Sequence, residues 1–559
     1  MKWRYPFVFI TLVFLFVCVI ARLFYWQIVK AEMLSELAQS QYNGIVRVLP
    51  RRGEIKTSDG FPIAANKVSY LIFLNPTEVK NKTLTINALS SLLDVPKASI
   101  SSQLLPDRLW VSIKSGVSAS KKGEIEKMQI PGVGFEEYYS RFYPEASIAA
   151  HLVGFVGKNE GGQDKGYVGL EGFYDRLLRG KERYTLELHD ALRRPILSRR
   201  IDNARSSDGS NLALSLDRSV QFLAEQKLKD GIERYGALGG MVGIMDPTTG
   251  GIVAMASFPS FSPQKYGEYD ESLYTNPFIT NTYEPGSTIK PIIMASALDS
   301  GLITPQTKCN ICGGPVAVSG YDLHTWNDKY HKDTNMIEVI QHSDNTGMVF
   351  VALRLGVDKM ISYLTRFGIG ELTDIDLQGE IAPTLKPRSA WYDVDLATTG
   401  FGQGISVTPI ELLTAFSALA NEGKIMQPHV VKAFENSNGK TLQIPIKVKG
   451  SPISAKTAKV MTEILVNAVE KGEAQWTKLK GYRIAGKTGT ASIPVAGHYD
   501  PKNTITSFIG FAPAEKPKFV MLVILDKPTS SVYAAETAAP IFFDIAKELL
   551  SYYGIPPSE

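Results

Sequence analysis

The sequence predicts a membrane-anchored protein of the α+β class, in which one N-terminal transmembrane helix precedes domains of helices and antiparallel strands. Three observations predict this arrangement. An almost unbroken apolar run covers residues 5–21. Apolar strand patterns joined by tight turns recur at residues 52–64 and 241–255, and helical patterns such as 220–233 stand between them. At 559 residues the chain has room for two or three domains.

The first element, residues 1–30, is predicted to be a short cytoplasmic tail and a single transmembrane anchor. The apolar run is long enough to span a bilayer. Lys2 and Arg4 precede it, which places the N-terminus in the cytoplasm and the rest of the chain outside it. Tyr25 and Trp26 fit an aromatic belt at the far side. A cleaved signal peptide is the alternative, but no small-x-small cleavage site follows the run.

Composition excludes some classes of protein. The chain carries 60 Lys and Arg against 56 Asp and Glu, a net charge of +4, without long basic blocks. The sequence therefore predicts no nucleic-acid partner. Three cysteines are too few for a fold held together by disulfides, and no tandem repeat is visible.

A candidate nucleophile lies in the segment E-P-G-S-T-I-K-P at residues 284–291. The Pro-Gly pair predicts a turn, and Ser287 is expected to cap the helix that follows. Residues three apart share a helix face, so Lys290 is expected beside Ser287. A lysine in a dry cleft can have its pKa lowered enough to take the serine proton. The alternative is a plain helix cap followed by a surface lysine, because S-x-x-K is common by chance.

Two further polar motifs follow in chain order. Ser343-Asp344-Asn345 is expected in a loop between two helical stretches, 336–341 and 347–355. Lys487-Thr488-Gly489-Thr490 is expected on an edge strand of the site, where Gly489 would let a ligand backbone approach closely. With S-x-x-K they form the signature of penicillin-recognising serine acyltransferases. The run F-G-Q-G-I-S-V-T-P at 401–409, R-G-E-I at 52–55 and G-L-E-G-F-Y-D at 169–175 extend the pattern. An amphipathic helix is predicted over 410–421, directly after the first run, and a terminal helix over about 538–552. The chain resembles the class B penicillin-binding proteins, monofunctional D,D-transpeptidases of peptidoglycan synthesis, and most closely their division-type (septal) members.

This resemblance implies the domain organisation. Residues 31–210 would form an elongated, non-catalytic pedestal of the dimerisation-domain type. Residues 211–559 would form the penicillin-binding transpeptidase domain, with the serine β-lactamase/D,D-peptidase-like fold of an antiparallel sheet between helices. The pedestal region shows no paired glutamates of a glycosyltransferase, so glycan polymerisation falls to another protein. His151 within it is expected to be packed or solvent-exposed, not catalytic.

The resemblance also implies roles for the motif residues. Ser287 would attack the penultimate D-alanine carbonyl of a stem pentapeptide, with Lys290 as general base and Ser343 relaying a proton to the leaving group. Substrate would be bound by residues of the second and third motifs: Asn345, Lys487, Thr488, Gly489 and Thr490. Asp344 would brace its loop. β-Lactams would acylate Ser287, and the reaction needs neither cofactor nor metal. A polytopic glycan polymerase and membrane proteins of the division complex are the expected partners.

Several alternatives remain open at this point. The same nucleophile could serve hydrolysis, as in a D,D-carboxypeptidase or β-lactamase, although no E-x-x-L-N-type element for activating water is evident. The chain could be a non-catalytic β-lactam sensor or division scaffold, against which the intact motifs argue. An elongation role competes with the division role.

The pair Cys309 and Cys312 forms a C-x-x-C motif on the outer side of the membrane. A disulfide suits an oxidising compartment. Zinc is the second possibility, with His324 and His331 following at a loosely suitable spacing, and free thiols are the third.

Overall fold

A computed structural model describes residues 2–48, 50–105, 107–188, 208–436, 438–495 and 498–557. The chain divides into two compact units. The first comprises Met1–Arg51 and Gly180–Gly209, and the second comprises Arg52–Arg179 and Ser210–Glu559. All the predicted site residues belong to the second unit.

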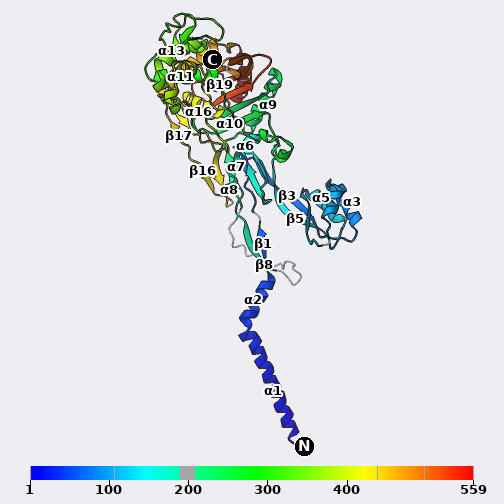
Figure 1. Cartoon of the computed structure of the whole chain (residues 1–559). Coiled ribbons are helices and arrows are strands. Elements are labelled where there is room, and N and C mark those ends of the chain that lie inside the picture. The colour runs from blue at the N-terminus through cyan, green and yellow to red at the C-terminus, as the bar shows by residue number, and fades with distance from the viewer. Residues whose placement is uncertain are drawn as a thin grey trace. The chain divides into compact units, whose positions relative to one another are not determined.

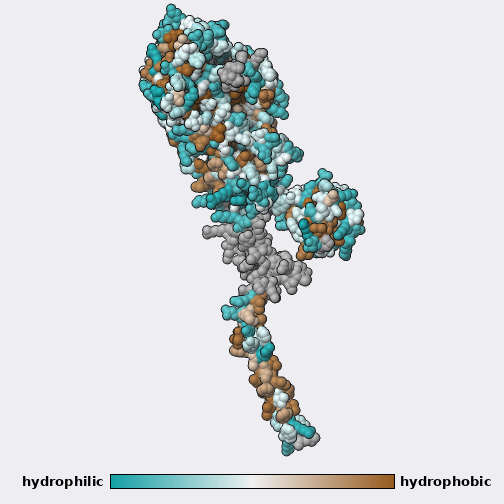
Figure 2. All heavy atoms as spheres, viewed as in Figure 1, coloured by the Kyte–Doolittle hydropathy of each residue, from teal (hydrophilic) through white to brown (hydrophobic). Residues whose placement is uncertain are grey.

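The first unit is built around an exposed apolar helix. Its elements are α1 (Arg4–Phe24), a π-helical turn (Tyr25–Val29), α2 (Ala31–Tyr42), and strands β1 (Asn43–Val48) and β8 (Arg183–Leu188), which pair antiparallel. Residues Arg4–Val29 form the one helix of the described chain that is long and apolar enough to cross a membrane, and none of α1 is buried in protein. Hydrophobic side chains run along it in Figure 2. The described chain therefore contains one candidate membrane-spanning helix, at the predicted position.

The second unit contains a seven-stranded sheet. Its strands are β16 (Thr441–Gln443), β15 (Val431–Glu435), β9 (Asn211–Leu214), β2 (Ile55–Lys56), β3 (Pro62–Leu74) and β4 (Val111–Val117) in spatial order, with β5 (Val133–Phe142) also on β3. Strands β2 and β3 form the predicted hairpin at 52–64. Helices of the same sequence region are α3 (Lys82–Leu93), α4 (Lys97–Gln103) and α5 (Ala119–Lys127). Strands from beyond residue 210 complete this sheet, and the division into 31–210 and 211–559 stays a prediction.

A buried ion cluster joins two of the sequence motifs of the N-terminal region. Glu171, on helix α7 (Gly169–Phe173), is fully buried and accepts hydrogen bonds from Arg52 and Arg141 at 2.7 and 2.6 Å. Arg52 also pairs with Asp175 at 2.8 Å. Charges removed from water are tolerated only when they are paired and hydrogen-bonded. The R-G-E-I and G-L-E-G-F-Y-D motifs thus contact each other through this ion cluster, which agrees with the non-catalytic, structural role expected for this region.

The other sheet carries the predicted catalytic edge. It is antiparallel throughout, with strands β11 (Ile252–Phe258), β10 (Gly239–Met245), β20 (Phe519–Asp526), β19 (His498–Ala512) and β18 (Ala485–Val495) in spatial order. Strands β10 and β11 are the predicted hairpin at 241–255. Strand β18, which contains the K-T-G-T motif, lies at the edge as predicted.

Helices cover both faces of this antiparallel sheet, as the predicted fold requires. Helices α9 (Arg218–Tyr235) and α18 (Ala538–Tyr552) share a core with one face. Helix α16 (Pro409–Ala420) packs on the other (Figure 1). The remaining helices of this part include α10 (Pro277–Thr280), α11 (Lys290–Asp299), α12 (Met336–Gln341), α13 (Asn345–Leu355), α14 (Val357–Arg366), α15 (Asp393–Thr399) and α17 (Ala455–Lys471).

Helix α16 differs from the prediction. The sequence indicated an amphipathic helix over 410–421, but all twelve residues of α16 are buried. The helix packs against strands β20 and β10 on one side and helices α11 and α17 on the other, so it has no solvent face. The buried carboxylate of its one acidic residue, Glu411, is hydrogen-bonded in a capping box with Thr408.

Candidate active site

The candidate nucleophile lies in a 3₁₀ turn, Gly286–Ile289, which leads directly into helix α11. The expectation that Ser287 caps this helix is wrong. Pro285 precedes the turn, and the Ser287 hydroxyl makes no cap bond. Its oxygen instead accepts a hydrogen bond from Ser343 Oγ at 3.0 Å. The hydroxyl is therefore free of the helix backbone and is held by a side chain of the second motif.

Close backbone approaches fix the position of this turn. Gly286 has φ +54°, and a Cβ there would lie 3.0 Å from the carbonyl oxygen of Thr490 on strand β18. A Cβ on Gly402 would lie 2.1 Å from the Gly286 carbonyl oxygen, and Gly286 N donates to Gly402 O at 3.1 Å. Tyr283 and Val407 pair through a β-bridge. The 401–409 run thus clamps the nucleophile turn, and its glycines leave room for this contact.

Gly489 serves a similar packing purpose. A Cβ at this position would lie 2.6 Å from Thr288 Cγ2, 2.5 Å from Ser507 Oγ and 3.2 Å from the carbonyl oxygen of Pro285. The sequence suggested that Gly489 leaves space for a ligand backbone. In the structure the glycine lets the nucleophile turn dock on strand β18, and the approach of a ligand stays a prediction.

Lys290 is fully buried and connects the first two motifs. Its Nζ donates to the carbonyl oxygen of Ser343 at 2.6 Å, to Ser343 Oγ at 3.2 Å and to Asn345 Oδ1 at 2.8 Å. The described hydrogen bonds therefore connect Lys290 to Ser287 through the Ser343 hydroxyl. The sequence placed Lys290 beside Ser287 by helical spacing, and in the structure the second serine is hydrogen-bonded to both residues.

The electrostatic environment of Lys290 suits a proton acceptor. The pKa of Lys290 is lowered to about 7, chiefly by burial and also by the positive charge of Lys487. The carboxylates of Glu473 and Asp344 oppose this shift. A substantial fraction of Lys290 is therefore neutral near pH 7, as a general base requires.

The Ser343–Asn345 loop stands between helices α12 and α13, as predicted. Ser343 has φ +53°, a left-handed backbone that is uncommon for a residue with a side chain and costs of order 1 kcal/mol. Asp344 caps α13 through Oδ1, which accepts bonds from N and Oγ1 of Thr346 at 2.8 and 2.7 Å. Asn345 Nδ2 donates to the carbonyl oxygen of His324 at 3.1 Å. This cap fixes the loop in the conformation in which Ser343 and Asn345 both accept hydrogen bonds from Lys290 Nζ.

The third motif brings a second buried lysine into the site. Lys487 is 3% exposed, and its Nζ donates to the carbonyl oxygen and the hydroxyl of Thr488 at 3.2 and 2.9 Å. Burial lowers the pKa of Lys487, and the charge of Glu473 opposes this. Thr490 Oγ1 accepts a hydrogen bond from Ala534 N at 3.1 Å. The hydroxyl hydrogen of Thr490 therefore stays available to a ligand.

One residue of the site was missed by sequence reasoning. Glu473, just beyond helix α17, accepts a hydrogen bond from the Thr488 hydroxyl at 2.6 Å and acts electrostatically on both lysines. It stands in the run K-G-E-A-Q, which matches none of the motifs. Only the packing of α17 against strand β18 brings it to the site.

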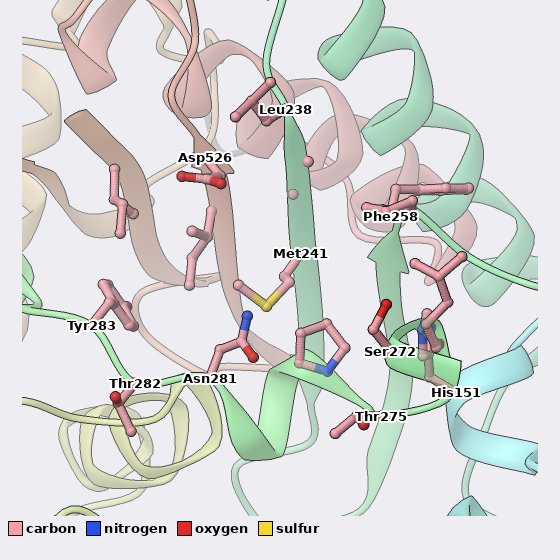
Figure 3. A pocket seen from close by; sticks show the side chains of 17 residues that line it. His151, Leu238, Met241, Phe258, Ser272, Thr275, Asn281, Thr282, Tyr283 and Asp526 are labelled. Atoms are coloured by element: carbon pink, nitrogen blue, oxygen red, sulfur yellow. Dashed lines mark hydrogen bonds between the residues drawn. The ribbon is translucent and has the colours of Figure 1, made fainter. Parts of the chain in front are cut away.

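Other sequence candidates lie apart from this chemistry. Cys309 and Cys312 form a disulfide, the first of the three possibilities considered. His151 is buried, with Nε2 on the carbonyl oxygen of Leu273, and burial lowers its pKa to about 4. It borders a cavity of about 340 Å³ between strands β10, β19 and β20 and the segment before the nucleophile turn (Figure 3). None of the predicted site residues lines this cavity.

Comparisons with known proteins agree with this architecture. The family model of the penicillin-binding protein transpeptidase domain matches residues 240–547, and that of the penicillin-binding protein dimerisation domain matches residues 47–214. The chain is 34% identical to stage V sporulation protein D of Bacillus subtilis, over 99% of this chain and 86% of the relative. It is 26% identical to the peptidoglycan D,D-transpeptidase FtsI of Escherichia coli, over 100% of this chain and 93% of the relative.

The fold is shared with solved structures. Penicillin-binding protein 3 of Mycobacterium tuberculosis, crystallised with aztreonam, superposes with a TM-score of 0.72 at 23% identity, covering 92% of this chain and 98% of that one. Two serine hydroxyls beside a lysine of lowered pKa are groups that a serine acyltransferase requires. The chain belongs to the penicillin-binding protein transpeptidases, with the dimerisation domain that marks the class B members.

Proposed function

We propose that this protein is a peptidoglycan D,D-transpeptidase that cross-links stem peptides through an acyl-enzyme on Ser287. The observation that carries the proposal is the continuous path from Ser287 Oγ through Ser343 Oγ to Lys290 Nζ, with steps of 3.0 and 3.2 Å. Two segments far apart in sequence, one with Ser287 and Lys290 and the other with Ser343, supply a nucleophile, a base and a relay in one cluster. A helix cap with a surface lysine would not produce this arrangement.

The acylation step follows from these contacts. With Lys290 neutral, the Ser287 proton passes to Ser343 Oγ while the Ser343 proton passes to Lys290 Nζ. Ser287 Oγ attacks the penultimate D-alanine carbonyl carbon, and the peptide bond to the terminal D-alanine breaks. The proton returns through Ser343 to the departing amine. In this proposal the N–H groups of Ser287 and Thr490 stabilise the oxyanion, at about 3 kcal/mol each.

The second half-reaction transfers the acyl group. An amine of a neighbouring stem peptide attacks the ester carbonyl, Ser287 Oγ leaves and takes up a proton, and an amide cross-link forms. β-Lactams would open on Ser287 in the same way and remain as stable esters. The D,D-transpeptidase names of relatives that match the chain almost end to end support this choice of reaction.

The cellular setting is also part of the proposal. We place the protein in septal wall synthesis, because the relatives include FtsI and a sporulation protein. Lys2 and Arg4 before the apolar helix support a cytoplasmic N-terminus and a catalytic unit on the outer side. A polytopic glycan polymerase and membrane proteins of the division complex would be its partners.

Mass spectrometry of the penicillin-treated protein tests the proposal. The adduct is expected on the peptide containing Ser287 and is expected to be absent from Ser287→Ala. Incubation with stem pentapeptides and an amine acceptor is expected to give cross-linked product together with free D-alanine. An adduct on Ser343, or release of D-alanine with hydrolysed donor only, would contradict the assignment.

A further inference from the structure

The cavity of about 340 Å³ beside the nucleophile segment has the volume of a small-molecule site. It lies wholly within the second unit, and none of Ser287, Lys290 and Ser343 lines it. Figure 3 shows its lining side chains on strands β10 and β20 and on the segment that leads to Tyr283. The cavity is therefore a separate site that adjoins the active site.

The sheet gives this cavity an apolar wall. Met241 is the cross-strand partner of Ile524, and Ile505 is the partner of Asp526. Partners across strands, and residues two apart on one strand, point to the same face of a sheet. Three apolar side chains and one carboxylate therefore stand side by side on the face that lines the cavity.

Asp526 is the one charged group among the described residues that line the cavity. No lysine or arginine lines it, and His151 is neutral because burial lowers its pKa to about 4. No described residue donates a hydrogen bond to the carboxylate, which is partly buried. Burial raises the pKa of Asp526, and the charge of Lys527, the next residue, opposes this rise. A carboxylate in this setting favours a cationic partner.

Polar side chains beside the carboxylate suit the same partner. Thr275, Asn281 and Thr282 line the cavity and are exposed, and their side chains make no hydrogen bond within the described chain. Their hydroxyl and amide oxygens can accept hydrogen bonds. A primary ammonium group has three hydrogens to donate and no acceptor. One carboxylate and several acceptors beside an apolar wall therefore match an ammonium group on an apolar body.

The cavity is connected to the nucleophile turn through Tyr283, which lines it four residues before Ser287. The backbone of Tyr283 pairs with that of Val407 in both directions at 3.0 Å, within the run that clamps the turn. The Tyr283 hydroxyl is buried and has no hydrogen-bond partner in the described chain. An occupant of the cavity would therefore pack against a side chain that no hydrogen bond anchors, at the entrance to the turn.

We propose that this cavity binds a small ligand with a primary ammonium group on an apolar body, that Asp526 holds the ammonium group, and that occupation stabilises the nucleophile turn. The binding itself is independent of the proposed function. Only the effect on acylation rests on that function.

A matched series of probes tests the binding. The probes are 4-phenylbutylamine, the neutral 4-phenylbutanol and the anionic 4-phenylbutanoate, titrated into the full-length protein in detergent and followed by saturation-transfer NMR. The amine is expected to bind with a Kd on the order of 1 mM, as suits a ligand of this size. The alcohol and the acid are expected to bind about tenfold more weakly or less, because they lack the charge-assisted hydrogen bond.

Two variants assign the binding to the carboxylate. Asp526→Asn is expected to lose about tenfold in affinity for the amine and to keep its affinity for the alcohol, which shows that the cavity is intact. Asp544→Asn is the matched control, because Asp544 is an exposed aspartate on helix α18, which covers the other face of the sheet. It should match the wild type. Thermal melting checks the folding of both variants. Equal affinity of Asp526→Asn and wild type for the amine would overturn the inference.

Blocking the active site distinguishes the two sites. Protein acylated on Ser287 by penicillin, with the adduct confirmed by mass spectrometry, should bind the amine as tightly as the free protein does. Loss of amine binding after acylation would place the amine in the active site and overturn the inference. If no penicillin acylated the wild-type protein, the proposed function would fail, whereas the comparison of Asp526→Asn with wild type would still decide the binding.

The effect on the turn is measured by stopped-flow acylation with a fluorescent penicillin. A ligand that binds the described conformation favours it, and in that conformation Ser287 is hydrogen-bonded to Ser343. Saturating 4-phenylbutylamine is therefore expected to raise the acylation rate of the wild type about fivefold, at the lower end of the usual coupling between two sites. The rate of Asp526→Asn should not change. An unchanged or lower rate in the wild type with the amine bound would refute the stabilisation of the turn.

Discussion

The protonation state of Lys290 should control acylation by β-lactams. The pKa of Lys290 is lowered to about 7, chiefly by burial and also by the charge of Lys487. The neutral fraction is then about one-tenth at pH 6, about one-half at pH 7 and about nine-tenths at pH 8. The acylation rate should therefore rise about tenfold between pH 6 and pH 8, because the rate of free enzyme follows the fraction of competent base.

Replacing the base isolates this effect from overall charge. In Lys290→Arg the guanidinium stays protonated at every accessible pH and cannot accept a proton. Acylation should fall by about 10²- to 10⁴-fold, the usual contribution of a general base, and Lys290→Ala should fall about as far. In contrast, Lys487→Arg retains the charge needed for a carboxylate and should keep more activity than Lys487→Ala.

The assay is stopped-flow acylation by a fluorescent penicillin at constant ionic strength, with thermal melting of each variant as the folding control. A flat profile between pH 6 and pH 8 would show that Lys290 does not titrate in this range. A Lys290→Arg variant that acylates near the wild-type rate would show that the proton goes elsewhere. Equal inactivity of both Lys487 variants would show that this lysine does more than supply charge.

Three further predictions follow from the contacts described above. Glu171→Ala should lower the free energy of unfolding by about 3–5 kcal/mol, because it leaves two buried arginines without their carboxylate partner. Chemical denaturation measures this loss, with Glu268→Ala at an exposed glutamate as the control. An equal loss of stability in the two variants would refute the prediction. Gly489→Ala should slow acylation about tenfold to a hundredfold in a folded protein, because the added Cβ displaces the nucleophile turn; a wild-type rate would contradict this contact. Cys309→Ser with Cys312→Ser should cost about 2 kcal/mol of stability from loop entropy but leave acylation within a few-fold, and complete loss in a folded double variant would contradict the peripheral role.

Sequence alone determined the features that depend on local patterns. The apolar run at 5–21 became helix α1, and the terminal helix α18 covers the predicted residues 538–552. The hairpin of β10 and β11 and the edge strand β18 also lie where predicted. Each of these is encoded by neighbours in the chain: by unbroken apolarity, by helical spacing, or by a turn between two apolar strands. The motifs pointed to the reaction class because their residue types and order are specific.

Tertiary structure decided what depends on contacts between distant residues. Helical spacing placed Lys290 beside Ser287, but only the tertiary fold brings the hydroxyl of Ser343, which has a left-handed backbone, into hydrogen-bonding distance of both. The pattern of 410–421 resembled a half-exposed helix, yet α16 is buried all round because sheet and helices meet on it. Glu473 lies in the site although it belongs to no motif, because its contact with Thr488 and its charge interaction with Lys487 depend on packing and not on its neighbours in sequence. Periodicity and motif order report on local conformation, whereas the proton path and the charge balance of the cleft arise only when segments more than fifty residues apart pack together.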